Sequence, residues 1–179
     1  LEPTNFRALN TKGAVAFYRR NYQEAVKYFK VALDNAPNDN IVKTNLAESY
    51  IEIGGYSSAI DLLLSIQESS PAWWFATGRA YLFVDNYTEA RNLLELVPTN
   101  EGSGKGRIHE AAAIAGLAKK EVNEDKRNTL TILAKNKLKE GIRQDPAKWH
   151  AILSGKQVDI HYGYTKVISL LEGIYEPVN

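Results

Sequence analysis

The sequence predicts an all-α protein built as an array of antiparallel helix pairs, without a sheet. Two observations carry this prediction: small and large residues recur with a long internal period, and a proline follows each of the first two copies. The period is about 34 residues, which is typical of helical repeat proteins. The first two copies are marked by Gly13, Ala25, Phe29 and Pro37, and by Ala47, Ala59, Leu63 and Pro71.

Each copy is predicted to form two helices joined by a short turn. Turn-forming residues followed by a tyrosine occur at residues 20–22, 54–56 and 85–87. Glycine or alanine at a helix crossing lets the two axes approach toward the short end of the usual ~8–10 Å range. One pair cannot bury its apolar stripe alone, so neighbouring pairs must stack to form a core.

These residues resemble the tetratricopeptide repeat (TPR) family, whose pattern runs W-x2-L-G-x2-Y, then A-x3-F, then P. The matching residues are Gly13, Ala25, Phe29, Ala32 and Pro37 in the first copy; Leu46, Ala47, Tyr50, Ala59 and Pro71 in the second; and Trp74, Gly78, Tyr81, Ala90 and Leu94 in the third. Lys12 and Ala16 depart from the family's leucine and tyrosine. The resemblance implies a right-handed superhelical array, a TPR-like α-solenoid, that binds other proteins.

The chain divides according to how well it follows this pattern. Residues 1–98 hold three TPR-like repeats, residues 99–107 form a glycine-rich loop, and residues 108–146 form a fourth, divergent repeat. Residues 147–179 are expected to be a degenerate repeat or capping helices, because terminal repeats need an atypical outer face. A strand over residues 157–164 is the alternative. The loop has three glycines and a lysine, but it lacks the spacing and the preceding strand of a phosphate-binding P-loop.

The composition favours a folded protein without a strong electrostatic partner. Hydrophobic residues make up 44% and charged residues 24%, and the net charge is +1. That balance predicts no general attraction to nucleic acid. No apolar run reaches the ~18–20 residues of a membrane span. Because the chain contains no methionine, we expect Leu1 to follow a processing or excision point in a soluble cytoplasmic or periplasmic protein.

The inventory of reactive residues does not predict an enzyme. There is no cysteine, which excludes disulfides and thiolate metal sites. The three histidines, His109, His150 and His161, form no metal-binding pair at helical spacing. The chain also lacks the G-x-S-x-G motif of a nucleophile elbow. We therefore expect no catalytic residues, no cofactor and no metal.

The first helix of each repeat is expected to line a concave groove that binds a peptide or protein segment. The predicted groove residues are Asn10, Phe17, Asn45, Glu48, Phe75, Arg79 and His109. Glu48 and Arg79 occupy equivalent positions in adjacent repeats, so their charged groups should lie roughly 10 Å apart. They could pair with each other or grip one peptide between them.

Family members that bind chaperone C-terminal tails use a clamp of lysine, asparagine and arginine. Asn45 stands where a clamp asparagine would be, but the other four clamp positions are Asn10, Ala14, Ala72 and Ala76. A clamp of this kind needs cations to hold the peptide carboxylate. The sequence therefore does not predict a chaperone-tail adaptor.

Two functions stay open: a peptide-binding module that uses the groove, or an assembly domain of a larger protein or complex. Trp73 separates them, because it lies beside the repeat's structural Trp74 but off its face. In the assembly hypothesis Trp73 is exposed on the convex side, where another chain or a second copy covers it. In both hypotheses the partner is a protein.

Overall fold

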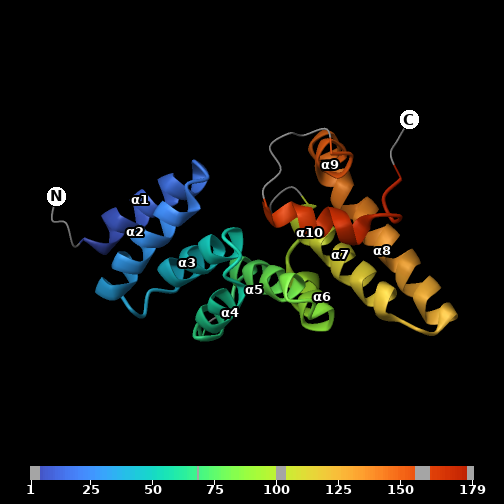
Figure 1. Cartoon of the computed structure of the whole chain (residues 1–179), viewed down its shortest axis with the longest axis horizontal. Coiled ribbons are helices and arrows are strands. Elements are labelled where there is room, and N and C mark those ends of the chain that lie inside the picture. The colour runs from blue at the N-terminus through green and yellow to red at the C-terminus, as the bar shows by residue number, and fades with distance from the viewer. Residues whose placement is uncertain (1–4, 68, 100–103, 156–161, 177–179) are drawn as a thin grey trace. The chain divides into compact units, whose positions relative to one another are not determined.

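The computed structural model describes residues 5–67, 69–99, 104–155 and 162–176. All regular elements in these residues are helices, as predicted (Figure 1). The helices are α1 (Phe6–Tyr18), α2 (Tyr22–Asn35), α3 (Asn40–Glu52), α4 (Tyr56–Leu64), α5 (Pro71–Phe83), α6 (Tyr87–Leu96), α7 (Lys105–Lys120), α8 (Glu124–Gln144), α9 (Pro146–Leu153) and α10 (Tyr162–Leu171). They fall into two compact units, Leu1–Ala80 and Tyr81–Asn179.

Unit 1 contains α1 to α4 and most of α5, and local signals determine where its helices begin and end. Asn5 caps α1 by accepting hydrogen bonds from the backbone N–H groups of Arg7 and Ala8, at 3.0 and 3.3 Å. Asp39 caps α3 in the same way through Val42, at 2.9 Å. The turns that end α1 and α3 contain left-handed residues, Arg20 (φ 64°) and Gly54 (φ 83°).

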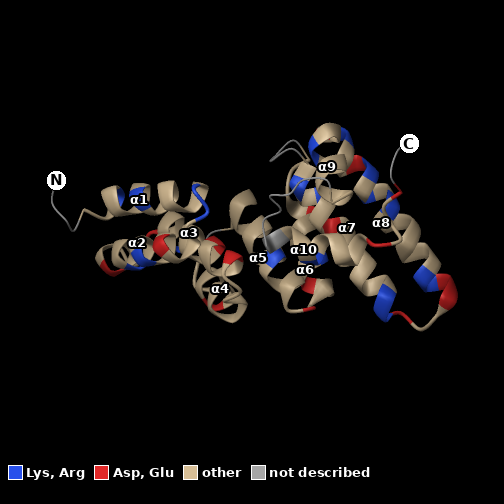
Figure 2. Cartoon of the chain, turned by 45° about the horizontal axis from the view of Figure 1, so that its top comes forward, with Lys and Arg blue, Asp and Glu red and all other residues tan. Residues whose placement is uncertain are grey.

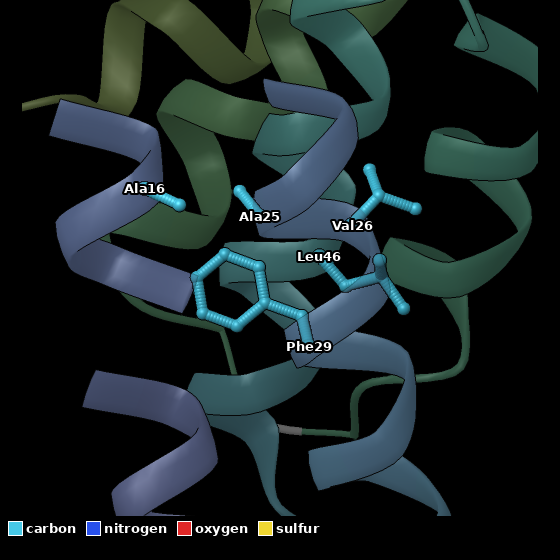
Figure 3. Close-up of a cluster of buried hydrophobic side chains, with 5 residues drawn as sticks. All are labelled: Ala16, Ala25, Val26, Phe29 and Leu46. Atoms are coloured by element: carbon cyan, nitrogen blue, oxygen red, sulfur yellow. The ribbon is translucent and has the colours of Figure 1, made fainter. Parts of the chain in front are cut away.

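The core of unit 1 forms where the helix pairs α1–α2 and α3–α4 meet. Figure 3 shows the ring of Phe29 pointing toward Ala16 and Ala25. Gly13 is also required here, because a Cβ added to it would stand 2.5 Å from Cε1 of Phe29. The small residues of the repeat pattern therefore make room for the large one, as the sequence predicts.

Unit 2 is built around α7, which packs against α6, α8 and α10, while α9 packs against α8. Glycines again lie at close crossings: an added Cβ on Gly116 would stand 2.7 Å from the ring of Tyr87, and one on Gly141 2.8 Å from Ile108. Arg107 ties α6 to α7 by donating a hydrogen bond to the carbonyl of Val97 at 3.0 Å. That carbonyl follows the end of α6, where helices leave acceptors without internal partners.

The predicted loop over residues 99–107 is too long. Helix α7 begins at Lys105, and both Gly106 and Arg107 are buried helical residues. Gly106 faces Val97, whose Cγ1 lies 2.8 Å from the position of an added Cβ. The glycine is therefore explained by close packing within a helix, whereas the sequence predicted that it belongs to a loop.

The C-terminal region is helical where the structure describes it. Pro146 occupies the first turn of α9, where a missing N–H costs no hydrogen bond. The alternative strand over 157–164 lies mostly outside the described residues, and its last part, from Tyr162, belongs to α10.

Candidate functional site

The inner row, as we name it, is the series Asn10, Phe17, Asn45, Glu48 and Trp73 on α1, α3 and α5 of unit 1. Its first four members were predicted from the sequence, and the structure brings them together. The side-chain amide of Asn45 donates a hydrogen bond from Nδ2 to Oδ1 of Asn10, at 2.9 Å. This bond links neighbouring first helices of successive repeats. Asn45 and Asn10 are both partly exposed.

The Glu48 pocket lies on one side of Asn45, between α1 and α3. It has a volume of about 60 Å³ and is lined by Ala14, Phe17, Tyr18, Phe29, Asn45 and Glu48. Glu48 is its one charged lining residue. The side chain of Tyr18 is 85% exposed, and its ring lies 6.1 Å from that of Phe17 in an edge-to-face arrangement. The pocket therefore combines a carboxylate with aromatic walls.

The Trp73 pocket lies on the other side of Asn45, between α3 and α5. It has a volume of about 300 Å³ and is lined by Asn40, Ile41, Thr44, Asn45, Ile66, Ser69, Ser70, Ala72 and Trp73. None of these residues is charged at neutral pH. Ile41 is 67% exposed and offers apolar surface at the mouth. Asn45 thus borders both pockets and stands between them.

The placement of Trp73 differs from the assembly hypothesis. This side chain is half-buried, and it shares a pocket with Asn45 of the inner row. Its indole N–H donates a hydrogen bond to the carbonyl of Leu63, at 2.8 Å. Trp73 is therefore neither fully exposed nor on a face opposite to the predicted groove residues. An indole N–H that donates to a backbone carbonyl is typical of a tryptophan that packs within its own chain.

Arg79 and Phe75 do not line an open groove. Arg79 pairs with Glu52, one helical turn beyond the expected Glu48, at 2.6 Å. Both members of the pair are buried, and the guanidinium of Arg79 lies 5.5 Å above the ring of Phe75, which is also buried. Burial raises the pKa of the neighbouring Tyr22 to about 12, and the charge of Glu52 adds to the rise. This cluster joins α2, α3 and α5 and has a structural role.

His109 belongs to unit 2 and is not an accessible groove residue. Its side chain is only 1% exposed, and Nδ1 lies 2.7 Å from the carbonyl oxygen of Lys105. The ring also lies 5.6 Å from that of Tyr164 on α10. Helix α10 therefore covers the side of α7 that was expected to continue the row.

The sequence interpretation did not identify three residues of this region. They are Glu52 as the partner of Arg79, Ile41 as a pocket residue, and Trp73 as a member of the inner row. Glu52 could have been found, because it lies four residues after Glu48 and so shares its helix face. Ile41 lies four residues before Asn45 on the same helix. The orientation of Trp73 depends on where α5 begins, and the sequence did not specify that this helix begins at Pro71.

Neither a metal centre nor a membrane span is found in the part of the chain that the structure describes. No group of three or more histidine, aspartate or glutamate side chains gathers there to hold a metal ion. Among the same residues, every helix is too short or too polar to cross a bilayer.

Comparisons with known proteins agree with this architecture. The family model of the tetratricopeptide repeat matches residues 6–39. The chain is 28% identical over 142 residues to tetratricopeptide repeat protein 12 of Homo sapiens. The matched segment covers 73% of this chain and 20% of that protein. It is 27% identical over 106 residues to the Mus musculus protein of the same name, covering 58% of this chain and 15% of the relative. The chain thus spans a fifth or less of these relatives' length.

Solved structures share the fold at low sequence identity. YrrB, described as a TPR protein with an unusual peptide-binding site, superposes with a TM-score of 0.57 at 13% identity, over 93% of this chain and 82% of that one. A double mutant of MamA gives a TM-score of 0.62 at 16% identity, over 97% and 98% of the two chains. The fold and the repeat define a protein of the α-solenoid class. Residues 6–39 match the tetratricopeptide repeat, and the chain resembles that family in its fold.

Proposed function

We propose that unit 1 binds an extended segment of a partner protein along the inner row. The observation that carries this proposal is the position of Asn45, which borders two pockets and is joined to Asn10. Their mutual bond uses one donor of Asn45 and one acceptor of Asn10. The carbonyl of Asn45 and the amino group of Asn10 then remain to match the N–H and C=O of a peptide backbone. The peptide-binding site described for YrrB supports the same class of ligand.

The proposed function is recognition without catalysis. The inner row holds amides, aromatic rings and one carboxylate, but it has no base placed beside a nucleophile. Its pockets are small, open and separated by Asn45, which suits contact with successive side chains of a peptide. We accordingly assign no cofactor and no reaction to this site.

Binding of a peptide library to the purified chain tests the proposal. Arrays of short random peptides give the best ligands, whose affinities are then measured by fluorescence anisotropy. Asn45→Ala should weaken these ligands by about three- to tenfold, because it removes hydrogen bonds worth roughly 0.5–1.5 kcal/mol. Asn38→Ala, which changes an exposed amide between α2 and α3, is the matched control and should bind like the parent.

The outcome that contradicts the proposal is equally clear. If the best peptides bind the Asn45→Ala variant with unchanged affinity, the inner row is not the peptide site. Melting temperatures of both variants must be measured alongside, because only a loss of binding at unchanged stability bears on recognition.

Assembly with other chains is a second candidate function, and the outer side of unit 1 favours it. A groove of about 570 Å³ runs between α2 and α4, with apolar Leu33, Leu46 and Leu62 among its lining residues. Val31 and Leu64 on these helices are 45% and 56% exposed. Sedimentation over a range of concentrations tests for self-association. A single species that does not change with concentration would rule out assembly between copies.

A further inference from the structure

We propose that the Glu48 pocket takes the cationic head of a lysine or arginine side chain of the bound segment. We further infer that an apolar side chain about three residues away enters the Trp73 pocket. Both inferences rest on the proposed function and give it a specificity: the ligand is a peptide that carries one basic and one apolar anchor at a fixed separation.

The chemistry of the Glu48 pocket is complementary to a cation. In the part of the chain that the structure describes, Glu48 has no salt-bridge partner, so its charge is available to a ligand. The aromatic rings of Phe17 and Tyr18 stand beside it. Ring faces attract lysine and arginine through their quadrupoles, and a carboxylate adds direct charge attraction. An anionic side chain would meet repulsion on the same surface.

The size of the pocket restricts what can enter. Its volume is about 60 Å³, well below the ~300–1,000 Å³ of pockets that take whole small-molecule ligands. Only a compact group, such as an ammonium or the tip of a guanidinium, fits that space. The methylene stem of the side chain would then lie along the exposed ring of Tyr18, since long basic side chains keep their apolar stems against apolar surface.

The Trp73 pocket selects a different kind of side chain. It is roughly 300 Å³ in volume and has no charged lining residue. A charged group placed there would lose hydration without gaining a counter-charge. Ile41, Ile66 and Trp73 instead provide apolar contact. We therefore assign this pocket to an aliphatic or aromatic side chain.

The separation of the two anchors follows from helix spacing. The pockets lie between successive helices of the series α1, α3 and α5, and packed helices stand ~8–10 Å apart. An extended chain in the polyproline II conformation advances ~3.1 Å per residue and places every third side chain on the same face. The two anchors should therefore be about three residues apart. A helical segment would bring residues with this separation only ~4.5 Å apart, which is too close.

The test uses synthetic peptides on an array, probed with the whole purified chain. One position of each peptide holds arginine, lysine, glutamine or glutamate, and a second position holds leucine, tryptophan or serine. The number of residues between the two positions is varied, beginning with adjacent positions. We expect arginine and lysine peptides to bind about tenfold better than their glutamine counterparts. The optimum separation should be about three residues. Glutamate peptides should bind least.

Variants of the pockets then assign the preference to particular residues. Glu48→Gln should abolish the preference for basic over glutamine peptides, and Glu48→Lys should reverse it in favour of glutamate. Glu24→Gln, which changes an exposed glutamate on α2, is the matched control and should keep the parent's preference. Ile41→Ser should remove the preference for leucine or tryptophan while leaving the basic preference intact.

The outcomes separate this inference from the function on which it rests. A basic preference that survives Glu48→Gln overturns the cation site, and so does Asn45-dependent binding of peptides without any basic preference. In both cases the peptide-binding proposal stands. Failure of all peptides to bind overturns the two proposals together.

Discussion

Residues of one chemical type have different roles in unit 1, and burial decides which role each has. Glu48 is half-exposed and borders a pocket, whereas Glu52, one turn later, is buried against Arg79. A buried ion pair whose partner is removed leaves an uncompensated charge away from water. Arg79, which the sequence predicted to contact a ligand, therefore has a structural role.

Arg79→Ala should destabilise the chain without a specific effect on peptide selection. We expect the free energy of unfolding to fall by roughly 3–5 kcal/mol, because the carboxylate of Glu52 is left buried alone. Urea denaturation monitored by circular dichroism measures it. Glu48→Ala should change stability by only about 0.5 kcal/mol or less, as expected for a surface position.

A second variant checks the cause of that loss. In Glu52→Gln combined with Arg79→Met, neither charge remains, so most of the stability should return. If Arg79→Ala alone unfolds at the same urea concentration as the parent, the pair is solvated and its burial contributes little.

The sequence identified residues that share one face of α3, but it did not identify the partner of Arg79. A helix turns ~100° per residue, so periodicity identifies the face on which Asn45, Glu48 and Glu52 lie. It does not specify how far one helix is shifted along its neighbour. That shift depends on how side chains such as Phe75 pack, and it decides whether Glu48 or Glu52 is level with Arg79.

At the scale of elements, the regular repeats could be predicted and the departures from them could not. Gly13 and Ala25 recur with a period, so their role in helix crossing is readable from the sequence. Gly106 follows two other glycines and looks like loop sequence, yet it lies in α7, where Val97 leaves no room for a Cβ. Likewise, the spacing of apolar residues in α10 does not indicate that this helix covers α7.

Helix α10 shields α7, and loosening it should expose His109. The two helices are tied by the ammonium of Lys119, which donates a hydrogen bond to the carbonyl of Ser169 at 2.8 Å. Leu171 of α10 is 1% exposed, and its truncation to alanine should cost roughly 2–5 kcal/mol of packing. We expect Leu171→Ala to speed the modification of His109 by diethylpyrocarbonate, measured by mass spectrometry of the peptide that contains it.

A surface substitution is the control for this prediction. Ile132 on α8 is 60% exposed, so Ile132→Ala should leave the modification rate of His109 near that of the parent. Rapid modification of His109 in the parent itself would contradict the covering role of α10.

At the scale of the whole molecule, charge is balanced rather than gathered. The chain carries 22 basic and 21 acidic residues, and Figure 2 shows both kinds distributed along the helices. Such a distribution gives no broad field to steer nucleic acid. The proposed recognition therefore depends on local features, such as the single carboxylate of the Glu48 pocket.

The chain should unfold in two cooperative steps, because each compact unit has buried apolar residues of its own. Gly13→Ala and Gly116→Ala form a matched pair of variants for this test. Each adds one methyl group that would stand within 2.7 Å of a ring, that of Phe29 in unit 1 and that of Tyr87 in unit 2. Overpacking of this kind costs roughly 1–3 kcal/mol, against a gain of about 1 kcal/mol in helix propensity from glycine to alanine.

Native-state hydrogen exchange read by mass spectrometry distinguishes the two units. Gly13→Ala should lower amide protection in α1 to α4 and leave α7 and α8 unchanged, while Gly116→Ala should do the reverse. The physical reason is that repeat arrays are stabilised chiefly by interactions between nearest neighbours, so a local strain raises the free energy of its own unit first. Equal loss of protection along the entire chain in both variants would show one cooperative body, and the division into two units would then have no energetic meaning.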